Sequence, residues 1–194
     1  MATEAVQKKL FTVDEYHRIA DVGILPEARR FELVRGEIIE MTIPGSSHSG
    51  RVNRLTYLFI SRLGQAVIVS GQNPVPLGPQ SEPMPDLGLL KPRSDFYTGA
   101  HPSPDDVLLV VEVSDTTVRY DSTVKTSLYA EAGIPEYWLL DVNKDVLVVR
   151  VDPSGGEYRS VRILHRGDTI SPLKLTSASF TVDEILGLSR GSEA

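Results

Sequence analysis

The apolar run at 107–113 most strongly limits the possible folds of this chain, because every residue in it except Glu112 is apolar. A continuous run of this length is typical of a β-strand that is buried on both faces. A helical pattern over 121–133 ends at Gly133, and a second apolar strand follows at 136–141. Strand, helix and strand in this order form a βαβ unit with parallel strands. The sequence therefore predicts an α/β fold with a mixed sheet flanked by helices.

Local patterns predict the remaining elements. The motif Phe-Thr-Val-Asp-Glu occurs at 11–15 and again at 180–184, and each copy has the Thr-to-Glu spacing of a helix capping box. Residues 30–41 predict two strands that turn at Arg35-Gly36. The other expected elements are a helix at about 48–63, strands at 66–70, around 73–77 and at 86–90, and an antiparallel extension at 145–152 and 158–164.

Length and composition set broader limits. A chain of 194 residues favours a single domain over 1–194, with polar, disordered tails at about 1–9 and 189–194. The absence of cysteine excludes disulfides, thiolate metal sites and a cysteine nucleophile, and fits a reducing compartment. The apolar runs are too short to span a bilayer, and the first residues lack the apolar core of a signal peptide. We therefore expect a cytoplasmic protein with no membrane partner.

The charge balance argues against general binding of nucleic acid. The net charge is −6, whereas a protein that coats nucleic acid needs clustered Lys and Arg. Between 41 and 81, however, the only charged residues are Arg51, Arg54 and Arg62, which share one arc of the predicted helix. These arginines are candidates for local contacts with phosphates, and the alternative is a solvated helix face.

Two carboxylates are the first candidates for a chemical role. Glu112 stands near the C-terminal end of a buried strand, where ligands of α/β sheets usually bind. Antiparallel pairing of the strand that follows Asp86 would bring Asp86 to the same end. Paired carboxylates need a cation or a shared proton, and oxygen ligands of this kind suit Mg²⁺ or Mn²⁺. The alternatives are a turn residue after Pro85 for Asp86 and a solvated strand end for Glu112.

Lys125 is the third candidate. On a regular helix it points with the apolar arc that contains Val124, Leu128 and Ala132. A lysine in this position either extends to solvent, pairs with Asp121 one turn earlier, or lies over the two carboxylates. The last arrangement is the one that a metal-dependent phosphodiesterase needs.

An ordered set of motifs extends over nearly the whole chain. It consists of Glu32-Leu-Val-Arg-Gly-Glu-Ile, His48, Pro85-Asp86, Glu112-Val113-Ser114, Asp121, Lys125, Tyr129 and Ala132-Gly-Ile-Pro-Glu-Tyr-Trp138. This set resembles the Uma-type restriction endonuclease family of the PD-(D/E)xK nuclease superfamily. The resemblance implies a restriction-endonuclease-like core and a Mg²⁺- or Mn²⁺-dependent endonuclease that acts on DNA.

The resemblance also implies roles for individual residues. Asp86 and Glu112 would bind the metal, with the carbonyl of Val113 as a further ligand. Ser114 stands where the superfamily motif has its lysine, so the catalytic lysine would be Lys125 on the following helix. Glu32 would complete the catalytic site; its alternative is a solvated strand residue.

Other residues are assigned with less specific support. His48 either touches the substrate or caps its helix, Arg51 and Arg54 would bind flanking phosphates, and Asp141 is expected to be structural. Two other functions remain open beside a DNA endonuclease. One is an inactive nucleic-acid-binding or interaction module of the same fold, and the other is a metal-dependent hydrolase of a small phosphorylated substrate. A homodimer is expected, with the C-terminal strands as its interface.

Overall fold

A computed structural model describes residues 7–187 of the chain. Its helices and strands, in chain order, are α1 (Val13–Asp21), β1 (Arg30–Val34), β2 (Glu37–Met41), α2 (Ser46–Leu63), η1 (Gly64–Ala66), β3 (Ile68–Gly71), β4 (Leu87–Leu90), η2 (Pro104–Asp106), β5 (Val107–Ser114), α3 (Val118–Tyr120), η3 (Asp121–Lys125), α4 (Thr126–Glu131), β6 (Glu136–Asp141), β7 (Val146–Ser154), β8 (Glu157–Leu164), β9 (Thr169–Ile170), β10 (Phe180–Thr181) and α5 (Val182–Leu186). The segments η1 and η2 are 3₁₀-helices, and η3 is a π-helix.

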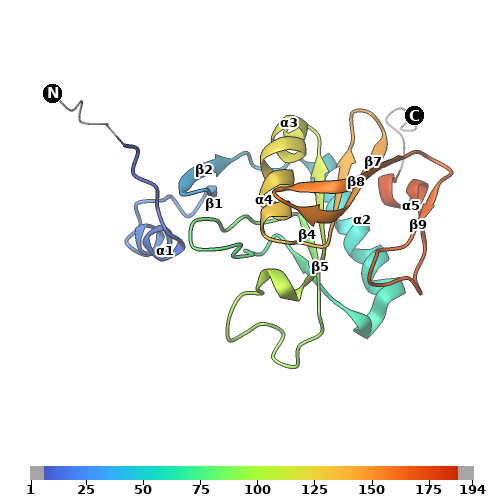
Figure 1. The fold of residues 1–194 in the computed structure, drawn as a ribbon, viewed down its shortest axis with the longest axis horizontal. Helices are drawn as coiled ribbons and strands as arrows, with labels where there is room; N and C mark the ends of the chain where they lie inside the picture. Colours follow the sequence, from blue (N-terminus) through green and yellow to red (C-terminus); the bar gives the residue numbers. More distant parts are fainter. Residues whose placement is uncertain (1–6, 188–194) are drawn as a thin grey trace.

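A six-stranded mixed sheet in the order β3-β4-β5-β6-β7-β8 forms the centre of the fold (Figure 1). Strands β5 and β6 are parallel, and all other neighbouring pairs of this sheet are antiparallel. The predicted α/β class, the βαβ unit and the antiparallel extension by β7 and β8 are therefore confirmed. The pairing of β4 with β5 is also antiparallel, as the candidate site requires.

Helices cover both faces of the sheet. On one face, α2 and α5 contribute Phe59 and Ile185 to a core that includes Trp138 of β6. On the other face, α4 contributes Tyr129, which packs beside Tyr137 of β6. Figure 1 shows α2 and α4 on opposite sides of the sheet. Side chains alternate along the second half of β5, so that Leu109, Val111 and Val113 pack in the core with α2, whereas Glu112 faces the helix that carries Lys125.

Both predicted capping boxes are present. Thr12 begins α1 and Thr181 begins α5, and in each the Thr hydroxyl accepts from the backbone N–H of the Glu three residues later. The predicted β1–β2 hairpin is also confirmed, with Arg35 and Gly36 in the left-handed region at its turn. Helix α2 begins two residues before the predicted start, at Ser46.

Two predicted elements differ from the structure. The segment around 73–77 is not a strand, because Pro74 and Pro76 have no N–H to donate to a neighbouring strand. The helix predicted over 121–133 is three consecutive helical segments, α3, η3 and α4. Its central turn is π-helical, a form that interrupts the regular helix period and often marks functional sites.

The predicted tails lie mostly outside the described residues. Residues 1–6 and 188–194 are not described, whereas Lys8 and Lys9 are exposed and form ion pairs with Glu37 and Glu15. Among residues 7–187, no helix is long and apolar enough to cross a membrane.

Candidate active site

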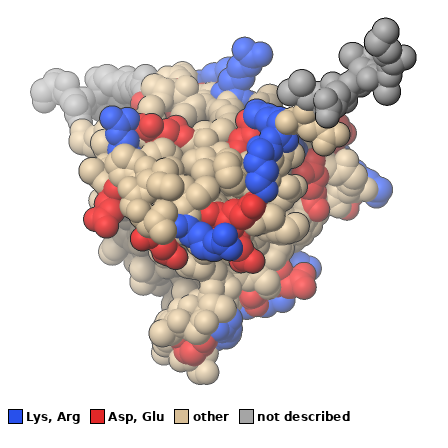
Figure 2. Space-filling view, turned by 90° about the vertical axis from the view of Figure 1, so that its left-hand side faces the viewer, with Lys and Arg blue, Asp and Glu red and all other residues tan. Residues whose placement is uncertain are grey.

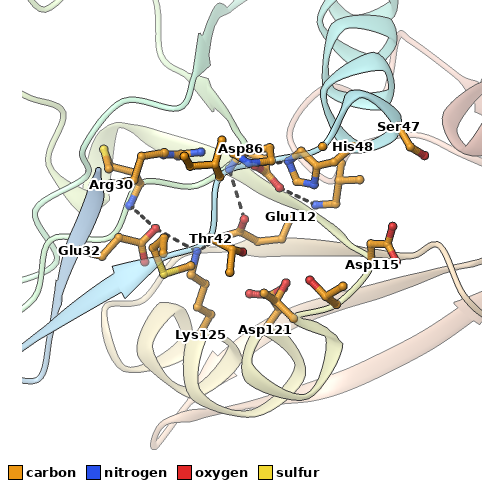
Figure 3. A pocket seen from close by; sticks show the side chains of 18 residues that line it. Arg30, Glu32, Thr42, Ser47, His48, Asp86, Glu112, Asp115, Asp121 and Lys125 are labelled. Atoms are coloured by element: carbon orange, nitrogen blue, oxygen red, sulfur yellow. Dashed lines mark hydrogen bonds and ion pairs between the residues drawn. The ribbon is translucent and has the colours of Figure 1, made fainter. Parts of the chain in front are cut away.

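A cavity of about 420 Å³ opens at the end of the sheet where β5 finishes. It is bounded by the β1–β2 hairpin, the first turn of α2, the chain just before β4, and the π-helix η3. Figure 3 shows that candidate residues from separate segments of the chain converge on it: Glu32, His48, Asp86, Glu112 and Lys125. Every one of these was singled out in the sequence.

Asp86 and Glu112 lie side by side. The pairing of Leu87 with Val111 places them at adjacent positions of neighbouring strands. The backbone N–H of Asp86 donates to Oε2 of Glu112 at 3.2 Å, and that of Val113 donates to Oδ2 of Asp86 at 2.9 Å. Asp86 is 7% exposed and Glu112 is 3% exposed. The two carboxylates are therefore buried at one corner of the cavity, and Glu112 is not a solvated strand end.

Lys125 binds two carboxylates in the interior. Its Nζ lies 2.9 Å from Oε1 of Glu112 and 3.2 Å from Oε1 of Glu32. The hydroxyl of Tyr129, one turn later, donates to the same Glu112 oxygen at 2.7 Å. Glu32 is 1% exposed, so it is not the solvated strand residue of the alternative interpretation.

The alternative ion pair between Lys125 and Asp121 is not formed. Oδ2 of Asp121 instead accepts from the hydroxyls of Ser114 and Thr117, at 2.8 Å and 2.5 Å. The π-helical turn separates the two side chains, and Lys125 extends to the carboxylates on the strands. Through Asp121, Ser114 thus anchors the helical segment that carries Lys125.

Burial and neighbouring charges shift the pKa values of this group. Burial raises the pKa of Glu112 above its ordinary value, although the positive charge of Lys125 opposes the shift. Burial alone would lower the pKa of Lys125, but the negative charges of Glu112 and Glu32 raise it above its ordinary value. We therefore expect Lys125 to keep its proton at neutral pH.

His48 reaches the site from the first turn of α2. Its Nε2 lies 2.9 Å from Oδ1 of Asp86. The hydrogen bond to Asp86 raises the pKa of His48 above its ordinary value. Its side chain thus contacts a site carboxylate rather than capping the helix, at which no side-chain cap bond is present.

The donor set fits a divalent cation. Asp86 and Glu112 supply adjacent hard oxygen atoms, and Mg²⁺ is commonly held by one or two carboxylates together with water. Oε2 of Glu32 is buried and has no hydrogen-bond partner, which leaves a carboxylate oxygen that a cation or water can satisfy. Among residues 7–187, no three His, Asp or Glu side chains already form a metal cluster. The side chains present thus fit a cation whose shell includes water.

The predicted phosphate contacts of α2 lie outside the cavity lining. Arg51 donates to the backbone carbonyl of Ser47, and Nε of Arg54 donates to the carbonyl of Glu184 at 2.8 Å. Arg62 also pairs with Glu184. The contacts with Glu184 of α5 hold Arg54 and Arg62 outside the cavity lining.

The cavity is lined by residues that the sequence interpretation missed. Arg30 lines it from β1, two residues before Glu32, and period-two alternation along the strand was the signal that could have indicated it. Asp115 and Thr117 line it from the segment after β5. Asp141, predicted to be structural, accepts the backbone N–H groups of Asn143 and Lys144 in a turn.

The family model of Uma2, described as "Putative restriction endonuclease", matches residues 13–183. The chain belongs to the Uma2 family. This confirms the resemblance based on the ordered motifs, and it supports a nuclease-like enzyme that acts on nucleic acid.

A solved structure shares the fold of this Uma2 chain. It is a protein from Anabaena variabilis ATCC 29413 that is described as "a putative nuclease belonging to DUF820". The two are 15% identical with a TM-score of 0.70, and the match covers 91% of this chain and 97% of the other. No curated protein matches the chain.

Proposed function

We propose that this Uma2 protein is a divalent-cation-dependent endonuclease that hydrolyses phosphodiester bonds of DNA. The observation that carries the proposal is the buried contact of Lys125 with Glu112, whose carboxylate lies beside Asp86. Two adjacent carboxylates can hold a divalent cation, and a lysine beside them can stabilise the negative charge that develops on a phosphate during hydrolysis. Membership of the Uma2 family gives independent support.

Asp86 and Glu112 would hold Mg²⁺ or Mn²⁺, with the carbonyl of Val113 as a further ligand. The bound cation would supply Lewis-acid chemistry to the phosphate and a water molecule. In the overall reaction, a bond forms between phosphorus and the water oxygen, the bond to one ester oxygen breaks, and a water proton ends on the leaving oxygen.

The remaining residues hold the two carboxylates in position and neutralise negative charge. Lys125 holds Glu112 and Glu32 in place and supplies positive charge beside the reacting phosphate. Because its pKa is raised, we assign it no proton-accepting role. Tyr129 fixes the Glu112 carboxylate through its hydroxyl, and His48 does the same for Asp86.

A metal-dependent hydrolase of a small phosphorylated substrate is the second candidate. The net charge of −6 favours it. On the face shown in Figure 2, acidic and basic side chains are interspersed rather than gathered into a basic surface. A small substrate needs only the contacts inside the cavity, whereas DNA would gain little from this outer face.

Cleavage assays on supercoiled plasmid and on single-stranded DNA test the proposal. Each substrate is incubated with Mg²⁺, with Mn²⁺ or with EDTA, and with wild type, Asp86→Asn or Lys125→Met. We expect cleavage that requires the cation and is lost in both variants. Asp95→Asn and Lys144→Met are matched controls because both side chains are exposed and line no part of the cavity. Cleavage that survives in EDTA or in both site variants would contradict the proposal.

The expected homodimer is a separate proposal. Val161 and Ile163 are 53% and 58% exposed on β8, which lies at one end of the strand order. Sedimentation of wild type and of Val161→Glu tests it, with a dimer expected only for wild type. A wild-type monomer would contradict it.

A further inference from the structure

The candidate site must attract an anion although most of the charged residues that line it are acidic. The carboxylates that line the cavity are Glu32, Asp86, Glu112, Asp115 and Asp121. A phosphodiester carries a negative charge, so entry into this cavity is opposed unless cationic groups face it. A single divalent cation offsets only part of this acidity.

Lys125 does not provide a free cation for the substrate. Its side chain is 3% exposed, and its ammonium group already binds Glu112 and Glu32. Breaking these contacts to reach a phosphate would leave two buried carboxylates without a positive partner, which is strongly unfavourable. Lys125 can therefore supply charge at short range but cannot leave its carboxylates to draw in the substrate.

The arginines of α2 are also engaged elsewhere. Arg54 and Arg62 bind Glu184, and Arg51 binds Ser47 at the rim. None of these three arginines lines the cavity.

Arg30 is the arginine that lines the cavity. It is the first residue of β1 and stands two residues before Glu32, so both side chains project from the same face of the strand. Figure 3 shows its side chain at the wall of the cavity beside Asp86. Arg30 and His48 line the same cavity, from β1 and from α2.

Among the described residues, the guanidinium of Arg30 is left without a hydrogen-bond or ion-pair partner. Within residues 7–187 it forms no hydrogen bond or ion pair, whereas the adjacent Arg29 pairs with Glu40. Arg30 is partly buried, so its side chain is held at the cavity wall instead of extending into solvent. A planar guanidinium with its donors unused is suited to binding two oxygens of one phosphate.

We propose that Arg30 binds a phosphate group of the nucleic-acid substrate inside the cavity, through two of its guanidinium N–H donors. The inference rests on the proposed nuclease function and adds a substrate-binding residue to it. Arg30, rather than the arginines of α2, would then hold the substrate backbone next to Asp86. This assignment also explains how an acidic protein binds a polyanion with one local contact.

Binding of a fluorescent DNA duplex, measured by anisotropy in Ca²⁺, tests this assignment. Ca²⁺ is used because it occupies oxygen sites like those of Mg²⁺ with looser geometry. We expect Arg30→Ala to weaken binding about 10- to 100-fold, the range for loss of a charged hydrogen-bonded contact. The slope of log K against log salt should fall by about one, as expected for a single lost phosphate contact.

Two further variants make the result specific. Arg30→Lys keeps the charge but loses the paired donors, so its affinity should lie between those of Arg30→Ala and wild type. Arg29→Ala is the matched control, because it removes the adjacent, exposed arginine, and it should change affinity by no more than about twofold. Thermal unfolding shows whether each variant is folded, and Arg30→Gln replaces Arg30→Ala if the latter does not fold.

The outcomes separate this inference from the proposed function. If wild type binds and cleaves DNA but Arg30→Ala and Arg30→Gln bind it with wild-type affinity and salt slope, the assignment of Arg30 is wrong and the nuclease function stands. If wild type neither binds nor cleaves any nucleic acid, the proposed function fails and the assignment fails with it.

Discussion

The ammonium group of Lys125 lies 2.9 Å from Oε1 of Glu112, and both side chains are buried. The same ammonium binds Glu32, which precedes it by 93 residues. One lysine thus joins the β1–β2 hairpin, the central strand β5 and the π-helix η3. These contacts explain how the fold keeps the carboxylates of Glu32 and Glu112 in its interior. They also attach the β1–β2 hairpin to the site.

Replacement of Lys125 by Met should destabilise the protein strongly. The substitution leaves Glu32 and Glu112 buried without a positive partner, a change that typically costs about 3–5 kcal/mol. Urea unfolding at pH 7 measures it, with Lys144→Met, an exposed lysine, as the control expected to change stability by less than about 1 kcal/mol. The added substitution Glu112→Gln should recover part of the loss. Equal stability of Lys125→Met and wild type would show that the buried pair is not ionised.

Tyr129→Phe should show whether the Tyr129 hydroxyl acts in catalysis by holding Glu112 or contributes only to stability. It removes a buried hydroxyl that donates to Glu112 at 2.7 Å, and we expect a loss of about 1 kcal/mol. Tyr158→Phe removes a similar buried hydroxyl, which donates to the carbonyl of Ile134 at 2.9 Å. Both variants should unfold at lower urea concentration, but only Tyr129→Phe should reduce the rate of DNA cleavage. An equal effect of the two variants on the rate would contradict this role of Tyr129.

Acid should weaken the attachment of α5. The hydrogen bond from Arg62 lowers the pKa of Glu184 from its ordinary 4.5 to about 2. Because the folded pKa is the lower one, the stabilisation by this carboxylate is present above pH 4.5 and is lost as pH falls through 2. The unfolding midpoint of wild type should therefore fall more steeply between pH 5 and pH 2 than that of Glu184→Gln. Parallel pH profiles would contradict this prediction.

Much of the site follows from local sequence. The apolar run around Glu112 predicts strand β5. The antiparallel pairing of β4 with β5 brings Asp86, which directly precedes β4, beside Glu112. The apolar arc predicts that Lys125 points inward, and the structure agrees. These predictions succeed because strand burial and helix faces depend on residues that are close in the chain.

Other features depend on contacts between distant segments. Arg54 is drawn to a carbonyl 130 residues away, and no helical period reveals that contact. Arg30 reaches the cavity only because the hairpin docks beside β5, which is a tertiary arrangement. In the π-helical turn η3, Asp121 and Lys125 bind different partners, whereas the pattern over 121–133 predicts a regular helix.

Titration with Mn²⁺, followed by calorimetry, tests most directly whether Asp86 and Glu112 form the cation site. Wild type and the control Asp95→Asn should bind Mn²⁺ with the same affinity, because Asp95 is exposed and bound to Arg93. Asp86→Asn should bind it more than tenfold more weakly, since loss of a ligand should cost at least as much as the roughly 10- to 100-fold loss typical of outer-shell partners. It should also fail to cleave plasmid DNA. Unchanged Mn²⁺ affinity together with wild-type cleavage in Asp86→Asn would contradict the assigned site.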